Sequence, residues 1–257
     1  MNQHLSRFLK YLATEKNRVP QTVANYDFYL SRFLNWANIS DPKKIDVTLI
    51  KNYHLWLARR TDHFGRPLKK STQNYHLIAL RSFLKFLKKN NLAGINFTGV
   101  KLNRTSNHLS RSLLPTELED LLAAPLKTDE SKNVQLRDKA LLEILFSTGA
   151  KVSALSGLKK QDIDLDAGTI SAAAEKIKHK LSNQGKYYLK LYLNQRRDGS
   201  PFIFIREDKA KSNKTTGSLT PRSIQRVIKN YAKNCGIKTK VTPQIIRQTV
   251  LRRQFIN

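Results

Sequence analysis

The sequence of 257 residues is poor in several features whose absence limits what the chain can be. It has a single cysteine, Cys235, so it can form neither an internal disulfide nor a metal site of several thiolates. It has no uninterrupted apolar run of about 18 residues, and its N-terminus lacks the apolar stretch of a signal peptide. These absences predict a soluble, cytoplasmic protein with no membrane partner.

Acidic residues are also scarce, since 19 Asp and Glu stand against 47 Lys and Arg, a formal net charge of +28. Hydrophobic residues make up 40% of the chain, enough to bury a core, which excludes a disordered basic tail. Residues 1–110 and residues 111–257 each have a net charge of +14. A folded, evenly basic chain favours a polyanion as partner, nucleic acid first, with a merely solubilising surface or ribosome-like packing as the alternative.

Helical periodicity dominates residues 1–90 and predicts a compact domain of four helices. Apolar residues recur at three- and four-residue spacing in residues 5–16 and again after Pro20. Asp46 is expected to cap a third helix and Ser71 a fourth. Basic residues occupy the outer face of the fourth helix, and two of them are candidate DNA contacts, Arg81 and Lys85.

Residues 91–112 lose this periodicity and are rich in Asn, Ser, Thr and Gly, which predicts an interdomain linker. An extended chain covers about 3.3 Å per residue. The predicted linker is therefore long enough to let two domains lie on opposite sides of a rod as wide as a DNA duplex.

The remaining residues, 113–257, predict a mixture of helices with a small β-sheet. Thr116 and Glu119 have the spacing of a capping box, and Gly149 is a natural helix end. Residues 162–171 alternate and contain a turn, which is typical of a strand pair. The other expected elements are helices at 137–147, 151–158 and near 186–196, a strand or extended packing segment at 202–205, and helices opening at Thr220-Pro221 and Thr242-Pro243.

Three segments in this order, residues 11–37, 146–170 and 219–249, together resemble the tyrosine recombinases, in particular Xer-like and phage integrases. The resemblance covers nearly the whole chain. It implies an N-terminal four-helix SAM-like core-binding domain joined by the linker to an α+β catalytic domain at 113–257. The pair would form a clamp around duplex DNA and use no metal or other cofactor.

The resemblance also assigns active-site positions, several of which differ from the family pattern. The Arg that follows the Gly and contacts the scissile phosphate in the family corresponds to Lys151, and the acidic residue after it to Ala154. The catalytic lysine lies on a β-hairpin in the family. Lys176 is the first assignment here and Lys178 the second, while another gap placement leaves Ala172 there.

A second cluster, His-x-x-Arg followed by His in the family, corresponds to Gln244, Arg247 and Gln248. Gln244 and Arg247 are three apart and share a helix face, but a glutamine cannot carry a proton at neutral pH as an imidazole can. The family's tyrosine nucleophile lies downstream of the Arg, whereas the last tyrosine here, Tyr231, falls on a helix stripe typical of core packing. The sequence is therefore expected to be a C-terminally truncated and catalytically impaired recombinase.

The resulting prediction is a site-specific DNA recombinase or integrase of the tyrosine type that still binds duplex DNA. Candidate DNA contacts in the C-terminal part are Lys178 and Gln248. An active recombinase or a second copy of the chain is the expected protein partner. The histidines show no metal-ligand spacing, so no metal site is expected. The alternatives are a non-catalytic duplex-binding module and an RNA- or ribosome-associated basic protein.

Overall fold

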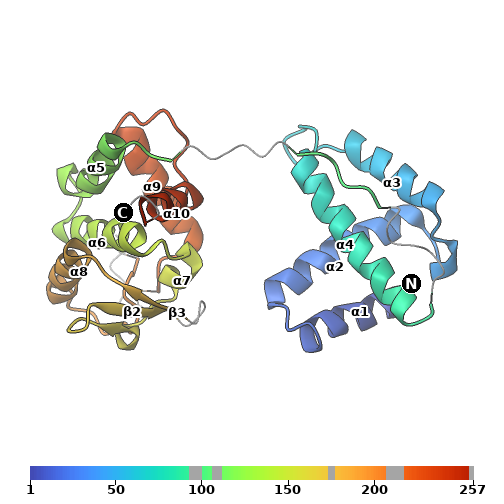
Figure 1. The fold of residues 1–257 in the computed structure, drawn as a ribbon, viewed down its shortest axis with the longest axis horizontal. Coiled ribbons are helices and arrows are strands. Elements are labelled where there is room, and N and C mark those ends of the chain that lie inside the picture. Colours follow the sequence, from blue (N-terminus) through green and yellow to red (C-terminus); the bar gives the residue numbers. More distant parts are fainter. Residues whose placement is uncertain (93–99, 106–111, 173–176, 207–216, 255–257) are drawn as a thin grey trace. The chain divides into compact units, whose positions relative to one another are not determined.

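Two separate hydrophobic cores divide the chain into an N-terminal unit, Met1–His108, and a C-terminal unit, Leu109–Asn257 (Figure 1). The computed structural model describes residues 1–92, 100–105, 112–172, 177–206 and 217–254. None of the helices formed by these residues is long and apolar enough to cross a membrane. The fold is mainly helical with one small sheet, which confirms the predicted fold class.

The N-terminal unit contains the four predicted helices. The predicted cap at Ser71 is wrong, because the fourth helix begins at Lys70, with Lys69 as its N-cap residue and no side-chain cap. Pro20 occupies the first turn of the second helix, where its missing N–H costs nothing. The Asp46 carboxylate caps the third helix by accepting from the Leu49 N–H at 2.6 Å. The elements are α1 (Asn2–Thr14), α2 (Pro20–Ala37), the 3-10 turn η1 (Pro42–Lys44), α3 (Val47–Arg59) and α4 (Lys70–Lys89).

Helix α4 is the central element of this unit and packs against α1, α2 and α3. The core is aromatic: ring centroids are 5.3 Å apart for Phe8 and Phe83 and 4.9 Å apart for Phe33 and Tyr53, and all four rings are fully buried. Burial of each such side chain stabilises the fold by about 1.5–3 kcal/mol. These buried rings hold the four helices against one another, and the helices in turn position the residues on the surface of this unit.

Part of the predicted linker is bound to the N-terminal unit. Residues 100–105 form a strap on it, in which the side-chain amide of Asn103 donates to Gln73 Oε1 at 3.0 Å and its Oδ1 lies 2.9 Å from His54 Nε2. Val100 is fully buried, and its carbonyl accepts a hydrogen bond from the Arg81 guanidinium. Only the rest of the predicted linker is left to connect the units.

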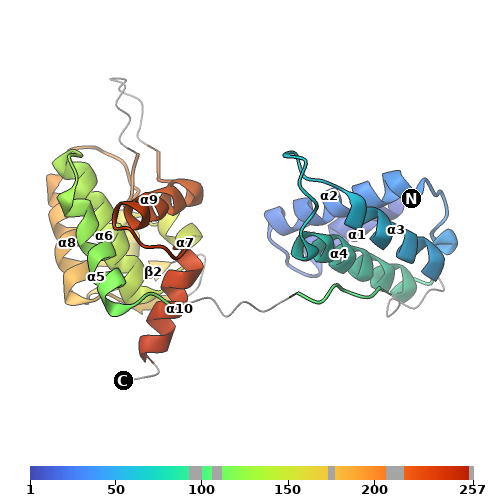
Figure 2. The same cartoon turned by 90° about the horizontal axis from the view of Figure 1, so that it is seen from above.

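The C-terminal unit is built around α6, with α8 on one side and α10 on another (Figures 1 and 2). Its three strands form an antiparallel sheet in the order β1-β2-β3, with Ile170 opposite His179. The elements are α5 (Pro115–Ala123), η3 (Ala124–Lys127), α6 (Lys132–Thr148), α7 (Val152–Ser156), η4 (Lys160–Asp162), β1 (Ile163–Asp164), β2 (Thr169–Ala172), β3 (Ile177–Lys180), α8 (Asn183–Gln195), α9 (Pro221–Asn234) and α10 (Pro243–Gln254).

Some boundaries differ from the sequence predictions. The predicted capping box of Thr116 and Glu119 is wrong, because Pro115 takes the first helical position and the Glu117 carboxylate instead accepts from the Leu114 N–H at 2.9 Å. Residues 202–205 form only isolated bridges rather than a strand. Their burial fits the predicted alternative, an extended packing segment. Helices α6 and α8 begin earlier than expected, at caps supplied by Ser131 and Ser182.

Candidate phosphate-binding site

The turn that ends α6 holds Lys151 at a fixed place on the surface. Gly149 ends the helix in the left-handed region, with a φ of 60°. The Thr148 hydroxyl donates to the Ile144 carbonyl at 2.6 Å and accepts from the Ala150 N–H at 3.1 Å, which closes the turn. The chain then passes directly into α7, whose N-cap residue is Lys151, and the lysine side chain is exposed.

Helix α10 brings Arg247 to this same turn. A Cβ atom built on Gly149 would lie 3.6 Å from Arg247 Cγ and 3.6 Å from Val250 Cγ1. Ile246 and Val250 are buried and anchor the helix, while Arg247 is half-buried. Arg247 therefore lies against the turn at Gly149, and Gly149 is two residues before Lys151 in the chain. The fold thus brings the end of α6 and helix α10 together, although about a hundred residues separate them in the sequence.

Gln244 and Gln248 lie three residues before and one residue after Arg247 on α10. Gln244 is exposed in the first turn, and Gln248 is half-buried. The Gln248 Oε1 atom is buried without a hydrogen-bond partner among the residues that the structure describes. Thr249, on the next position, accepts from the Leu113 N–H at 3.1 Å and so ties α10 to the start of this unit.

The basic hairpin is described only in part. Lys176 lies outside the described residues, so its predicted catalytic position has no structural account. Lys178 lies on β3 opposite Ser171 and is exposed, as is Lys180 on the same face of the strand. Lys178 stays a candidate phosphate contact.

One further position of the family pattern, and the last tyrosine of the chain, are part of the core. Ala154, at the position of the family's acidic residue, is buried. Tyr231 is buried and donates to Asp138 Oδ2 at 3.0 Å, and Asp138 in turn accepts from Arg137 Nε at 2.8 Å. Burial and the neighbouring Asp138 carboxylate raise the pKa of Tyr231, which makes its phenolate harder to form. This confirms core packing as the role of that tyrosine.

The two candidate DNA contacts of the N-terminal unit differ from one another. Lys85 is exposed on α4. Arg81 is half-buried and its guanidinium donates to the Val100 carbonyl of the strap, so its position is set by the fold of this unit. This bond was not predictable from a local pattern, because the Val100 carbonyl lies nineteen residues after Arg81 in a stretch without periodicity.

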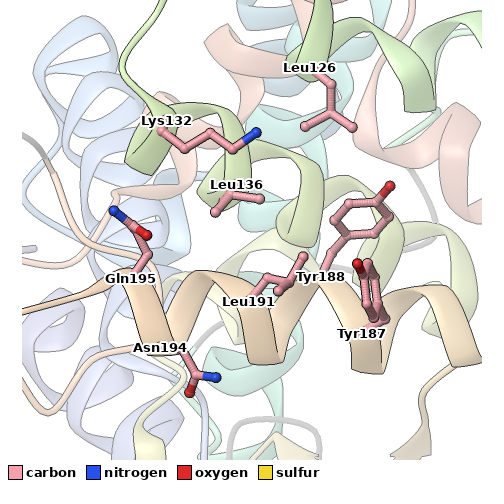
Figure 3. A pocket seen from close by; sticks show the side chains of 8 residues that line it. All are labelled: Leu126, Lys132, Leu136, Tyr187, Tyr188, Leu191, Asn194 and Gln195. Carbon is pink, nitrogen blue, oxygen red and sulfur yellow. The ribbon is translucent and has the colours of Figure 1, made fainter.

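A pocket of about 450 Å³ on the C-terminal unit is separate from these residues (Figure 3). It lies between α6 and α8, whereas Arg247 is on α10. Its lining mixes leucines, tyrosines and amides with one lysine: Leu126, Lys132, Leu136, Tyr187, Tyr188, Leu191, Asn194 and Gln195. Among the described residues there is also no group of three or more His, Cys, Asp or Glu able to hold a metal ion.

The family model described as phage integrase family matches residues 111–254, which is more than half of the chain. The chain belongs to the phage integrase family. A second model, the phage integrase N-terminal SAM-like domain, matches residues 5–91 of this integrase-family chain. Both matches fit the tyrosine recombinase resemblance of the sequence.

Relatives of this family member include tyrosine recombinases. Tyrosine recombinase XerC of Bacillus licheniformis is 29% identical over 257 residues, which covers 95% of this chain and 80% of the relative. Tyrosine recombinase XerD of Chlorobaculum tepidum is 29% identical over 251 residues, with the same two shares.

Solved structures show the same fold. A lambda integrase dimer bound to a core site superposes with a TM-score of 0.69 at 15% identity, covering 98% of this chain and 85% of that one. A Tn1549 transposon integrase in complex with circular-intermediate DNA gives a TM-score of 0.69 at 15% identity, covering 98% and 87%.

Proposed function

We propose that this integrase-family chain binds duplex DNA and holds a backbone phosphate between Lys151 and Arg247 without cleaving it efficiently. The observation that carries the proposal is the contact of Arg247 with the Gly149 turn, which directly precedes Lys151. Two cationic residues at one rigid turn suit a phosphodiester, since charge-assisted hydrogen bonds to phosphate are among the stronger ones in proteins.

The chemistry of the same residues argues against efficient cleavage. Lysine keeps the charge of the family's arginine but lacks the planar fork that donates two parallel hydrogen bonds. Gln244 and Gln248 replace imidazoles, and an amide neither gives nor takes a proton at neutral pH. Each change weakens stabilisation of the charge that develops on the phosphoryl oxygens, while leaving ground-state binding largely intact.

Several further assignments belong to this proposal. Lys178, Lys85 and Gln248 are assigned as additional DNA contacts, with Lys176 as the hairpin lysine. Residues 1–90 and 113–257 act as the two DNA-binding domains. The integrases of similar fold were solved with DNA, one of them as a dimer, which supports duplex DNA as ligand and a second copy or an active recombinase as partner. DNA as ligand also favours the cytoplasm as the place of action.

The test is binding of the full chain to a fluorescent duplex at several salt concentrations. The slope of log K against log salt is expected to be steep, about −0.9 for each phosphate neutralised. The variants Lys151→Ala and Arg247→Ala should each reduce the steepness by about 1. Lys190→Ala is the matched control, because Lys190 is an exposed lysine of the same unit on α8. A flat salt response, or tighter binding to single-stranded RNA than to duplex DNA, would overturn the proposal.

A further inference from the structure

The loop between α3 and α4 folds into a small hairpin that projects beyond the helices of the N-terminal unit (Figure 2). Thr61 and Pro67 form an antiparallel bridge at its base. The Asp62 N–H donates to the Arg66 carbonyl at 2.7 Å, and the Gly65 N–H donates to the Asp62 carbonyl at 3.0 Å. We name residues 61–67 the α3–α4 hairpin.

One carboxylate organises the tip of this hairpin. Asp62 Oδ1 accepts from the Phe64 N–H at 2.9 Å and the Arg66 N–H at 3.0 Å, and Oδ2 accepts from Arg66 Nε at 3.0 Å and Nη2 at 2.8 Å. Gly65 supplies the positive φ of 73° that the turn needs. The bonds from Arg66 lower the pKa of Asp62 to about 2, so the carboxylate is charged and the tip is held at neutral pH.

This ordered tip presents an aromatic side chain to solvent. Phe64 is 68% exposed, more than any other large hydrophobic side chain among the described residues. The Arg66 guanidinium lies over its ring at 4.7 Å, and the His63 ring lies 3.8 Å from it. The bonds of Asp62 thus hold the backbone that carries the Phe64 ring. Because this ring does not pack in the core, core packing does not explain the ordered tip.

The surroundings of Phe64 are strongly basic. Across residues 59–70 the only acidic residue is Asp62, and Arg66 already neutralises it. The five basic side chains of this stretch are all exposed: Arg59, Arg60, Arg66, Lys69 and Lys70. An apolar tip next to exposed cations is complementary to a polyanion that has apolar surface between its charges.

We propose that the α3–α4 hairpin is a preformed contact with duplex DNA, in which Phe64 packs against sugar and base edges in the minor groove. The flanking cations bind the phosphates on either side. Apolar side chains used in this way are a recurrent device of minor-groove binding. A tip that is already ordered loses less conformational entropy on binding than a mobile loop would. The inference rests on the proposed function, because it requires that the chain bind duplex DNA.

The first test removes the ring. Phe64→Ala in the full chain should weaken binding to duplex DNA at least about fivefold, with the salt slope unchanged, because an apolar contact displaces no counterions. Leu55→Ala is the matched control, since Leu55 is 60% exposed on α3 of the same unit. Equal duplex affinity of Phe64→Ala and the parent chain would overturn the inference.

The second test separates shape from charge. Asp62→Ala removes a negative charge, so a purely electrostatic surface would bind DNA more tightly after the substitution. The preformed tip predicts the opposite, namely weaker binding, because Asp62 holds Phe64 in place. Asp27→Ala, which makes the same charge change at an exposed position of α2, should bind as well as the parent chain or better. Tighter binding by Asp62→Ala, comparable to that of Asp27→Ala, would contradict the inference.

The outcomes distinguish this inference from the proposed function. A parent chain that binds duplex DNA with a steep salt slope, together with a Phe64→Ala variant of equal affinity, leaves the proposed function standing and removes only the hairpin contact. A parent chain with no affinity for duplex DNA overturns both. A Phe64→Ala variant that loses affinity only for single strands would also overturn the minor-groove contact.

Discussion

The side-chain amide of Asn74 pairs with both backbone groups of Asn103. Asn74 Oδ1 accepts from the Asn103 N–H at 2.7 Å, and Asn74 Nδ2 donates to the Asn103 carbonyl at 3.0 Å. The amide of Asn74 on α4 thereby supplies the acceptor and the donor that a neighbouring strand would supply in a β-sheet. Because Asn103 is bonded to the N-terminal unit and Ser112 to Arg252 of the C-terminal unit, residues 104–111 connect the two. Fully extended, such a stretch spans on the order of 30 Å.

Asn74→Ala should release the strap. The substitution leaves the Asn103 N–H and carbonyl without their partners, which is expected to lower the free energy of unfolding by about 1–2 kcal/mol. Urea unfolding of the full chain measures this loss, and amide hydrogen exchange at Asn103 reports the release directly. Asn52→Ala, at an exposed position of α3, is the control and should leave both quantities unchanged. Slow exchange at Asn103 in the Asn74→Ala variant would show that other contacts hold the strap.

The strap illustrates which features a sequence reveals. The helices of the N-terminal unit were predictable because their signals are local: apolar periodicity, Pro20 and the capping carboxylate of Asp46. The strap depends on side chains of α3 and α4 that meet a distant, aperiodic segment, so no local pattern announces it. The α3–α4 hairpin lies between these cases, since residues 61–67 interrupt the helical pattern of the sequence, which does not tell how exposed Phe64 is.

In the candidate site, too, some features were predictable from local sequence patterns and others were not. Lys151 follows a helix-ending glycine, and that local arrangement was predictable from residues 146–151. The meeting of this turn with Arg247 was expected only through the family resemblance, because nothing in the composition of either segment specifies their contact. The start of α5 was missed by a small shift, since Pro115 fits the first helical position better than the predicted Thr116 fits the cap.

Gly149→Ala tests the turn that positions both cationic residues. The added Cβ meets Arg247 and Val250 at ordinary contact distances, so the cost comes mainly from the φ of 60°. An alanine in the left-handed region is expected to lower the stability by about 1–2 kcal/mol. Thermal unfolding of the full chain measures the change. Gly157→Ala is the control because Gly157 has a negative φ and no neighbour closer than 3.9 Å, so an equal loss there would contradict the explanation.

His76 should make the stability of the N-terminal unit depend on pH. Its ring is buried, its Nδ1 lies 3.3 Å from the Tyr53 hydroxyl, and it packs on the Tyr29 ring at 4.5 Å. Burial, helped by the Arg32 charge, lowers the pKa of His76 to about 4. The unfolded state therefore binds more protons between pH 6.5 and pH 4. The stabilisation is complete above pH 6.5 and is lost as the pH falls, by up to about 1.4 kcal/mol per unit.

Unfolding free energies of the parent chain and of His76→Gln, measured between pH 7 and pH 5, check this expectation. The difference between the two slopes isolates His76 from the carboxylates, which titrate in both proteins. Parallel slopes would mean that His76 takes up no additional proton on unfolding.

The full chain should form no covalent adduct with a nicked suicide duplex. Lys151 offers no planar fork to the phosphoryl oxygens, and Gln244 and Gln248 offer no proton. Denaturing gel electrophoresis detects an adduct, and a native gel shift of the same samples verifies that the DNA was bound. An adduct that survives denaturation would show that a side chain of the chain attacks the phosphate despite these three substitutions, and would contradict the proposed lack of efficient cleavage.

Exchanging lysine and arginine within the site separates geometry from charge. Lys151→Arg keeps the net charge but adds the fork, so it should bind duplex DNA about threefold more tightly, and Arg247→Lys should bind it more weakly by a similar factor. The salt slope should stay the same in both variants, because the number of cations does not change. Lys190→Arg on α8 serves as the control, since an exposed lysine away from the site gains nothing from the fork. Affinities that follow charge alone, with both exchanges equal to the parent chain, would mean that these two side chains do not hold a phosphate directly.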